Sequence, residues 1–459
     1  MVKKKIAIVG AGVTGLAAAY RLKSKNRNFE ISVFETKEKS GGKIATSSFS
    51  GLQIDEGADA FLVRSPWAID LFNEIGLSDE LISPAARNAS VWCDGKLIPL
   101  PSPNILGIPL EVNTFDSQFL NPLDLKKIEQ GGKSTSDLTL KTDFSIGEVV
   151  RSCVGNSVFE KLVDPLLGGI NAGNADEMSC ATMAPQLLEA ALNEEGLVSS
   201  LSKAQKKIDL SIPIFNTHKM GVGHIIKKLA EKVEDSIQLC EEVISIKKNK
   251  NCWLVQTNKR TEKVDAVILA TPAPVAAKLL NPICPDVSKY LFQIEHASVS
   301  MVTFAFAKND LKLSKDQSGF LVPRSENLLM TACSFSGNKW PHLDDGTQSI
   351  LRVSTGRIDD ERHNHLSDQN LVKALKRDLE ITIGVTEEQI DARVTRWPKA
   401  MAQFAVGHLE KIENTTSQLR EETPGISIAG SYHYGVGIPA CIRSGSAAAL
   451  SVCEKLENN

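Results

Sequence analysis

The sequence lacks the features that mark membrane-spanning, disulfide-rich and nucleic-acid-binding proteins. No run of apolar residues approaches the length of about 18 that a membrane-spanning helix needs. The nine cysteines are scattered without a Cys-x-x-Cys pair, which indicates reduced thiols rather than a disulfide framework. A net charge of −3 provides no basic field for nucleic acid. We therefore expect no transmembrane segment and no nucleic-acid partner.

The beginning of the chain lacks the pattern of a secretory signal. Lysines stand at positions 3 to 5, but the apolar run Ile6–Val9 behind them is too short for the apolar region of a signal peptide. Together with the reduced cysteines, this favours a cytoplasmic protein. Peripheral contact with a membrane stays open.

No residue pattern identifies a catalytic triad or a metal centre. Spacing alone singles out no Ser-His-Asp arrangement, so the catalytic residue is unknown at this point. His363-Asn364-His365 has the composition of a metal site, but it lies in a charged run without a third ligand signal. This pattern favours a solvated loop, and we predict no metal.

The informative signal that is present lies at the start of the chain. The apolar run leads directly into Gly10-Ala11-Gly12-Val13-Thr14-Gly15, and a second apolar strand ends at Glu35. In order, the three glycines permit a tight turn, let the backbone approach a pyrophosphate and let the helix close onto the strand. Glu35 can accept hydrogen bonds from a ribose diol. The alternative is a glycine-rich turn in any α/β domain, and the flanking strand, helix and acid favour a dinucleotide site.

The residues after Glu35 bear on which dinucleotide binds. Ser40-Gly41-Gly42-Lys43 is followed by an alternating stretch, Thr46–Ile54, and then by Asp55-Glu56-Gly57-Ala58-Asp59-Ala60. The glycine pair allows close backbone approach, and Lys43 adds a cation where phosphates or a flavin edge would lie. This insertion resembles the flavoprotein amine oxidase superfamily, which binds FAD. The resemblance changes the expected cofactor from NAD to FAD.

Nucleotide-domain signals recur far apart in the chain. Strand-like runs occur at 243–246, 252–255 and 265–270, and a strand at 425–430 precedes a helix from about Pro439 to Leu456. The prediction is an α/β fold with a Rossmann-like FAD-binding domain assembled from discontinuous segments, residues 1–88, 234–285 and 420–459. The alternative of several independent domains is less favourable, because a half of about 60 residues buries little surface.

Two inserts separate these segments. Residues 89–110 and 286–419 are predicted to form an α+β substrate domain, in which an antiparallel sheet is joined by a helix at 368–383. Residues 111–233 are predicted to form a helical subdomain, with helical periodicity at 183–191 and 224–233. Between residues 104 and 143 the periodicity weakens, which indicates a surface excursion.

The closing segment Gly435-Val436-Gly437-Ile438-Pro439 carries the second strong signal. Its glycines free the backbone, and a proline suits the first turn of a helix. The helix N-terminus would face an anion, such as the negative charge that develops on a flavin when it accepts a hydride. The alternative is an ordinary glycine loop that caps a C-terminal helix.

Three stretches resemble the porphyrinogen oxidases of haem biosynthesis, and the similarity runs from about residue 4 to 455. They are Gly435–Gly445, Asp164–Gly173 and the segment from Trp397 to His408. Within that family, residues 56–62 and 91–96 look like the bacterial branch that oxidises coproporphyrinogen III.

The resemblance implies a set of FAD contacts, and the implied residues are Gly10, Ala11, Gly12, Val13, Thr14, Gly15, Glu35, Thr36, Gly42, Lys43, Gly57, Ala58, Asp59, Ala60, Val243, Trp397, Val436, Gly437 and Ile438. Val243 would hold the adenine through its backbone. Trp397 would lie near the flavin, although large aromatic side chains more often belong to a core. The substrate carries carboxylates, and Arg64 is the leading anchor for one of them. The alternative is a surface arginine.

The implied reaction is oxidation of a porphyrinogen in three two-electron steps, with O2 as acceptor and hydrogen peroxide as product. Coproporphyrinogen III is the first candidate substrate, and protoporphyrinogen IX is the second. A flavin oxidase of amines or polyenes and a flavin-free binding protein of the same fold remain as alternatives. The resemblance leaves open whether a downstream ferrochelatase is a partner. The oligomeric state is unknown at this point.

Overall fold

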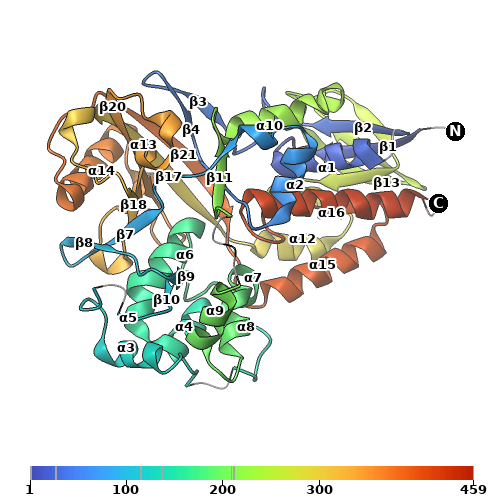
Figure 1. Cartoon of the computed structure of the whole chain (residues 1–459). Coiled ribbons are helices and arrows are strands. Elements are labelled where there is room, and N and C mark those ends of the chain that lie inside the picture. The colour runs from blue at the N-terminus through green and yellow to red at the C-terminus, as the bar shows by residue number, and fades with distance from the viewer. Residues whose placement is uncertain are drawn as a thin grey trace.

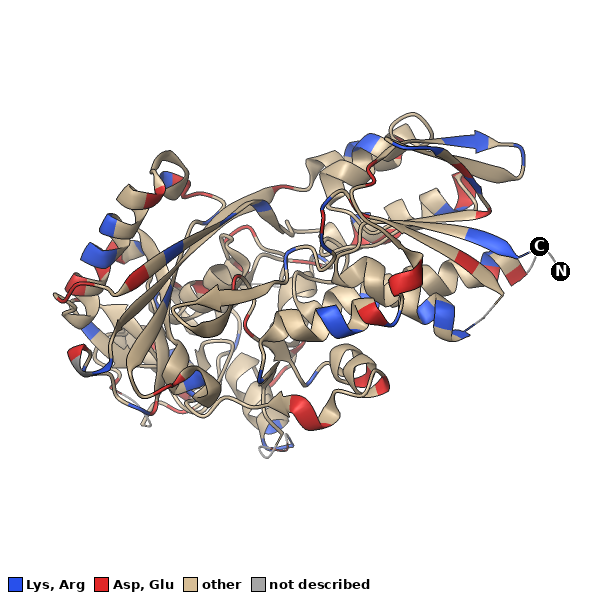
Figure 2. Ribbon diagram, turned by 90° about the horizontal axis from the view of Figure 1, so that it is seen from above, with Lys and Arg blue, Asp and Glu red and all other residues tan. Residues whose placement is uncertain are grey.

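Residues 3–25, 28–113, 116–135, 138–207, 209 and 212–457 are described in a computed structural model of the chain. Figure 1 shows both chain ends in one lobe, and a second lobe in which a large sheet lies above a group of helices. Figure 2 shows basic and acidic residues intermingled on both lobes. Among the described helices, none combines the length and the apolar character needed to cross a membrane.

The first lobe is built on a five-stranded parallel sheet. Its order is β12 (Ile237–Gln238), β2 (Phe29–Phe34), β1 (Lys4–Val9), β16 (Ala266–Leu269) and β22 (Ile426–Ile428). Both faces of a parallel sheet are covered, which accounts for the apolar sequence of β16 and of β1 from Ile6 to Val9. The strands come from three distant parts of the chain, which confirms the predicted α/β fold with a discontinuous nucleotide-binding domain.

Helices α1 (Val13–Lys25) and α16 (Ile438–Glu457) cover one face of this sheet and pack against each other. Gly445 permits their close crossing, because a Cβ atom there would lie 2.1 Å from the Thr14 carbonyl oxygen. The other face packs against further elements, which are β13 (Val243–Asn249), β14 (Cys252–Thr257), β15 (Thr261–Val264), α11 (Ala273–Leu280), α12 (Pro285–Gln293) and α15 (His408–Glu422). The first helix and the last helix of the chain thus cross beside the first glycine turn.

Helix α10 (Val222–Glu231) departs from the predicted domain division. Its buried residues Ile225 and Leu229 belong to the same core as α1, whereas the sequence placed residues up to 233 in the helical subdomain. Helical periodicity identifies the apolar face of a helix but not the surface that this face will cover. Strand β11 (Phe215–His218), which precedes α10, pairs with β5 (Phe61–Leu62) and β6 (Leu81–Ile82).

The second lobe contains a seven-stranded sheet. Its order is β21 (Asp391–Ala402), β17 (His296–Ala307), β20 (Gln348–Thr355), β19 (Met330–Phe335), β18 (Gln317–Leu321), β7 (Asn88–Cys93) and β8 (Lys96–Pro99). The pairing is antiparallel as predicted, except that β18 and β7 run parallel. Helix α14 (Asp368–Ile383) backs the sheet with the predicted bounds. It begins after the Ser367 cap and ends at Gly384, which has a positive φ of 68°.

Figure 1 shows a group of helices below this sheet, and they are α3 (Pro122–Glu129), α4 (Ile146–Val154), α5 (Asn156–Val158), α6 (Asp164–Asn171), α7 (Cys180–Met183), α8 (Pro185–Ala191) and α9 (Leu197–Gln205). The interpretation of residues 104–143 as a surface excursion is wrong for the described part of that segment. Leu110, Leu120 and Ile128 are buried in the core of this helical region. The apolar residues of this segment are spaced too irregularly in the sequence to indicate a helix or a strand, so their burial was not predicted.

Candidate cofactor-binding site

The first glycine turn has the geometry that its sequence predicts. Gly10 has a φ of 102°, and a Cβ atom there would lie 2.7 Å from the Ala270 carbonyl oxygen. A Cβ atom at Gly15 would lie 1.9 Å from the Gly10 carbonyl oxygen, so only glycine lets α1 close onto β1. In contrast, a Cβ atom at Gly12 would meet nothing nearer than 3.9 Å. The open space beside Gly12 is where a ligand can approach the backbone.

The second glycine pair lies against the first turn. The Gly41 N–H donates to the Ala11 carbonyl oxygen at 2.8 Å, and Gly12 and Gly41 form a parallel bridge. Gly42 has a φ of 66°, and a Cβ atom there would lie 3.1 Å from the Gly12 Cα atom. Two backbone turns separated by about 30 residues therefore form one glycine-lined cradle.

Glu35 lies at the edge of this cradle and is buried. Its carboxylate accepts hydrogen bonds from the Ala11 N–H at 2.9 Å and the Lys37 N–H at 3.0 Å. The exposed Thr36 hydroxyl donates to the same carboxylate at 3.2 Å. These bonds fix the carboxylate beside the glycine turn, where the sequence predicts a ribose contact.

Val243 approaches the cradle from β13. Glu241, two positions before Val243, lies alongside the end of β2, because its N–H donates to the Glu35 carbonyl oxygen at 2.8 Å. The pairing of β13 with β14 is irregular between Val243 and Ser245. Val243 itself pairs with Thr257, but β13 is an edge strand of its three-stranded sheet. The contact of its backbone with an adenine stays a prediction.

Lys43 reaches from the cradle toward the second lobe. Its ammonium donates to the Ala400 carbonyl oxygen of β21 at 2.6 Å. The residue is exposed to solvent, yet protein surrounds its ammonium, and the resulting desolvation lowers the pKa of Lys43. A cation with so little competing solvation is suited to a phosphate or a flavin edge.

The Gly57–Ala60 loop is held by the second lobe through Asp59. Its carboxylate accepts hydrogen bonds from the Lys339 ammonium and the Trp340 indole N–H, each at 3.0 Å, and forms an ion pair with Arg352 at 3.2 Å. Arg352 also donates to the Gly57 carbonyl oxygen. The two cations hold the pKa of Asp59 well below its usual range despite desolvation, which acts in the opposite direction. The Asp59 side chain is thus committed to protein partners, so a cofactor contact predicted for Asp59 would have to be made by its backbone.

Trp397 lies beside the Gly57–Ala60 loop and outside the apolar cores of the described residues. It is half-buried on β21, and its indole N–H donates to the Glu56 carbonyl oxygen at 3.3 Å. A Cβ atom at Gly57 would lie 3.7 Å from the same indole nitrogen. The structure therefore brings together Trp397 and the Gly57–Ala60 loop, which are about 340 positions apart.

The closing loop lies at the N-terminus of α16. Gly435 has a φ of 124°, and Gly437 is exposed immediately before the helix begins at Ile438. Just before this loop, burial and the neighbouring His408 lower the pKa of His433 to about 3, so this histidine is neutral. The free N–H groups at the start of α16 are suited to stabilising negative charge.

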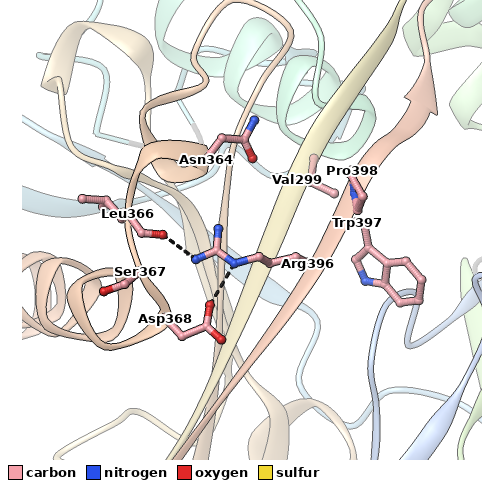
Figure 3. Close-up of a pocket in the computed structure, with 8 residues that line it drawn as sticks. All are labelled: Val299, Asn364, Leu366, Ser367, Asp368, Arg396, Trp397 and Pro398. Atoms are coloured by element: carbon pink, nitrogen blue, oxygen red, sulfur yellow. Dashed lines mark hydrogen bonds and ion pairs between the residues drawn. The ribbon is translucent and has the colours of Figure 1, made fainter.

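A separate cavity of about 390 Å³ lies beside Trp397 (Figure 3). Arg396, which lines it, points away from Trp397 and donates to the Asp368 carboxylate at 2.8 Å. The remaining guanidinium donors reach the carbonyl oxygens of His363 and Leu366. Because these donors are occupied, the cavity offers no free cation to an anionic ligand.

The prediction that His363 lies in a solvated loop is wrong. His363 is fully buried, and neither ring nitrogen has a hydrogen-bond partner. Burial and the nearby Arg396 lower the pKa of His363. His365 is exposed as expected. Within the described residues, the group with metal-ligand spacing is Cys93, Asp94 and Glu326, which includes neither histidine.

Three residues that hold the Gly57–Ala60 loop were missed by sequence reasoning, and they are Lys339, Trp340 and Arg352. They lie on or beside α13 (Ser336–Lys339) and β20, about 280 to 295 positions from Asp59. No local pattern connects residues at that distance. The predicted anchor Arg64 follows β5, is exposed, and has no ion-pair or hydrogen-bond partner among the described residues.

The cradle fits a dinucleotide with an extended second half. The glycine turns leave room for a pyrophosphate, Glu35 lies beside them where the sequence predicts a ribose contact, and the Gly57 loop and Trp397 lie against each other. This arrangement defines an FAD-dependent oxidoreductase on an α/β nucleotide-binding fold.

Comparison with known proteins identifies the family. Residues 13–453 match the flavin containing amine oxidoreductase family, and the chain belongs to it. FAD is its cofactor, as predicted. The chain is 31% identical to the coproporphyrinogen III oxidase of Bacillus subtilis over 97% of each chain. It is 28% identical to the enzyme of that name from Staphylococcus aureus, over 99% of this chain and 100% of the relative.

Solved structures agree with this assignment. A putative protoporphyrinogen oxidase from Exiguobacterium is 30% identical over the whole of both chains, with a TM-score of 0.87. Cyclohexylamine oxidase from Brevibacterium oxydans is 16% identical, with a TM-score of 0.72 over 99% of this chain and 100% of that chain. The second comparison shows the same fold, and the relatives together confirm the predicted resemblance to porphyrinogen oxidases.

Proposed function

We propose that this chain oxidises coproporphyrinogen III to coproporphyrin III in haem biosynthesis. The observation that carries the proposal is the similarity to coproporphyrinogen III oxidases over nearly the whole of both chains, at 31% identity. That similarity covers both the cofactor cradle and the seven-stranded sheet. We assign substrate binding to residues 89–110 and 286–419, and FAD binding to the three discontinuous segments.

The proposed reaction removes six hydrogens from the porphyrinogen. FAD accepts two electrons at a time, so each porphyrin requires three rounds, and three O2 molecules take up the electrons and protons as three H2O2. The backbone at Gly42 and the Glu35 carboxylate hold the nucleotide half. Trp397 and the Gly57–Ala60 loop position the flavin, and the start of α16 stabilises its negative charge. Aromatisation supplies driving force, so no strong catalytic base is assigned.

The proposal also includes the cellular location of the protein, the next enzyme and a residue that anchors the substrate. We place the protein in the cytoplasm, where reducing conditions keep thiols free, and the nine cysteines are all free. The metal-free product is suited to a ferrochelatase as the next enzyme. Arg64, which is exposed and has no partner among the described residues, is the proposed anchor for one substrate carboxylate.

The deciding experiment compares initial rates on coproporphyrinogen III and protoporphyrinogen IX. We expect the purified protein to be yellow and to form fluorescent coproporphyrin III at a rate about tenfold above that for protoporphyrin IX, which corresponds to about 1.4 kcal/mol of discrimination. Three H2O2 should appear for each porphyrin. Oxidation of an amine without porphyrin formation would refute the proposal.

Protoporphyrinogen IX is the second candidate substrate. Two comparisons favour it: the Exiguobacterium structure, described as a putative protoporphyrinogen oxidase, and a 26% identical protoporphyrinogen oxidase of Arabidopsis thaliana. A faster reaction with protoporphyrinogen IX in the same experiment would establish this alternative.

A further inference from the structure

Arg443 has an unusual setting in the first turns of α16. It is exposed, and its guanidinium carbon lies 3.9 Å from the centroid of the Tyr434 ring and 6.0 Å from that of Trp67. Tyr434 immediately precedes the glycine loop of the cofactor site. Among the described residues, no hydrogen bond or ion pair engages the guanidinium. Arg443 is therefore positioned by two aromatic rings and not by an acid.

Stacking on aromatic rings leaves an arginine free to bind an anion. The contact uses the face of the guanidinium, whereas its N–H groups point outward in the guanidinium plane. A carboxylate can accept two parallel hydrogen bonds from that edge. Because the rings already restrict the long side chain, less conformational entropy is lost when a carboxylate binds.

The surroundings of Arg443 contain little competing negative charge. Residues 430–453 include no aspartate or glutamate. Asp59, in the neighbouring loop, is occupied by Lys339 and Arg352. Asp70 lies one turn beyond Trp67 on α2 (Pro66–Glu74), but no ion pair joins it to Arg443. The positive charge of Arg443 is thus uncompensated within the described structure.

A second free guanidinium and exposed apolar side chains lie on the adjacent elements. Helix α16 contacts both β5 and α2, and Arg64 lies between these two elements. Leu62 and Trp67 on the same two elements are 44% and 41% exposed. Exposed apolar side chains on the same elements as two arginines that have no partner among the described residues suit a ligand with an apolar body and carboxylates at its edge.

We propose that Arg443, held by Tyr434 and Trp67, binds a propionate of the porphyrinogen as an anchor additional to Arg64. This inference rests on the proposed function and names a specificity-determining residue for it. Arg443 acts on binding of the substrate and not on the electron transfer, which takes place at the flavin.

The test measures KM and kcat of the holoenzyme and of R443Q with coproporphyrinogen III. Loss of a charge-assisted hydrogen-bond pair is expected to raise KM about tenfold, with kcat within about twofold of the parent. R443K keeps the charge but loses the planar fork, so its KM should lie between those of the parent and R443Q. R420Q is the matched control, because Arg420 is an exposed arginine on α15 that has no hydrogen-bond or ion-pair partner in the described part of the chain.

The tetramethyl ester of coproporphyrinogen III separates charge recognition from packing. It lacks the carboxylates, so R443Q and the parent should have equal KM values with it. An unchanged KM for the free acid, or an equal rise with the ester, would overturn the role of Arg443. If R443Q loses FAD, the test is made with R443K instead. An unchanged KM of R443K for coproporphyrinogen III would then overturn the proposed role of Arg443. A parent enzyme inactive on both porphyrinogens would instead refute the proposed function.

Discussion

Replacing Gly15 with alanine is expected to produce a destabilised protein that purifies without its yellow colour. The new Cβ atom would lie 1.9 Å from the Gly10 carbonyl oxygen, and this backbone atom has no rotamer with which to move away. Closing the contact requires α1 to separate from β1, which we expect to cost about 3 kcal/mol. Flavin absorbance per protein and the thermal midpoint measure the two effects, and the midpoint should fall by about 6 °C.

Two other glycines provide matched controls for this substitution. Gly12→Ala has its nearest neighbour at 3.9 Å, so it should fold normally but bind FAD more weakly, because the Cβ atom occupies the space needed for the pyrophosphate. Gly169→Ala, within α6, meets nothing within 4 Å and should keep its FAD with equal or slightly higher stability. A yellow, stable Gly15→Ala protein would contradict the geometry of the turn.

Local signals predicted those parts of the fold whose cause is local. The strand, glycine turn and helix from Lys4 to Lys25 follow from adjacent residues, and so do the bounds of α14 between Ser367 and Gly384. The fingerprint at Gly10–Gly15 and the loop at Gly435–Gly437 were found because positive φ and close backbone approach require glycine at fixed spacings.

Features with distant causes were missed or wrongly placed. Periodicity identified α10 as a helix, but its place beside α1 depends on tertiary packing. His363 lies in a charged run, yet Gly356 packs against its ring and it is buried. The resemblance implies a cofactor contact at Asp59, which stays a prediction, but no local pattern indicated that its side chain binds Lys339 and Arg352 in the other lobe. Sequence distance hides such pairs from any local pattern.

Asp59 connects the two lobes at the cofactor site, so its removal should affect stability and FAD retention together. Asp59→Asn keeps an acceptor for the Trp340 N–H but leaves Arg352, whose side chain is 4% exposed, without a counter-charge. Breaking a buried ion pair costs about 3 kcal/mol or more, and the one-fifth exposure of Asp59 and Lys339 reduces this to about 2 kcal/mol. We expect the thermal midpoint to fall by about 5 °C and FAD to dissociate more readily.

The pH dependence separates the charge of Asp59 from its shape. The folded-state pKa of Asp59 is depressed, so its contribution to stability is fully present above the unfolded pKa of about 4 and is lost as the pH falls below that value toward the folded pKa. The stability difference between the parent and Asp59→Asn should therefore be nearly constant from pH 7 to pH 5 and should shrink as the pH falls below about 4. Asp235→Asn is the control, because its ion pair with Lys23 is exposed and contributes little at any pH. A difference that is independent of pH would show that Asp59 acts through hydrogen-bond geometry, and the ion pairs to Lys339 and Arg352 would then not be what joins the lobes.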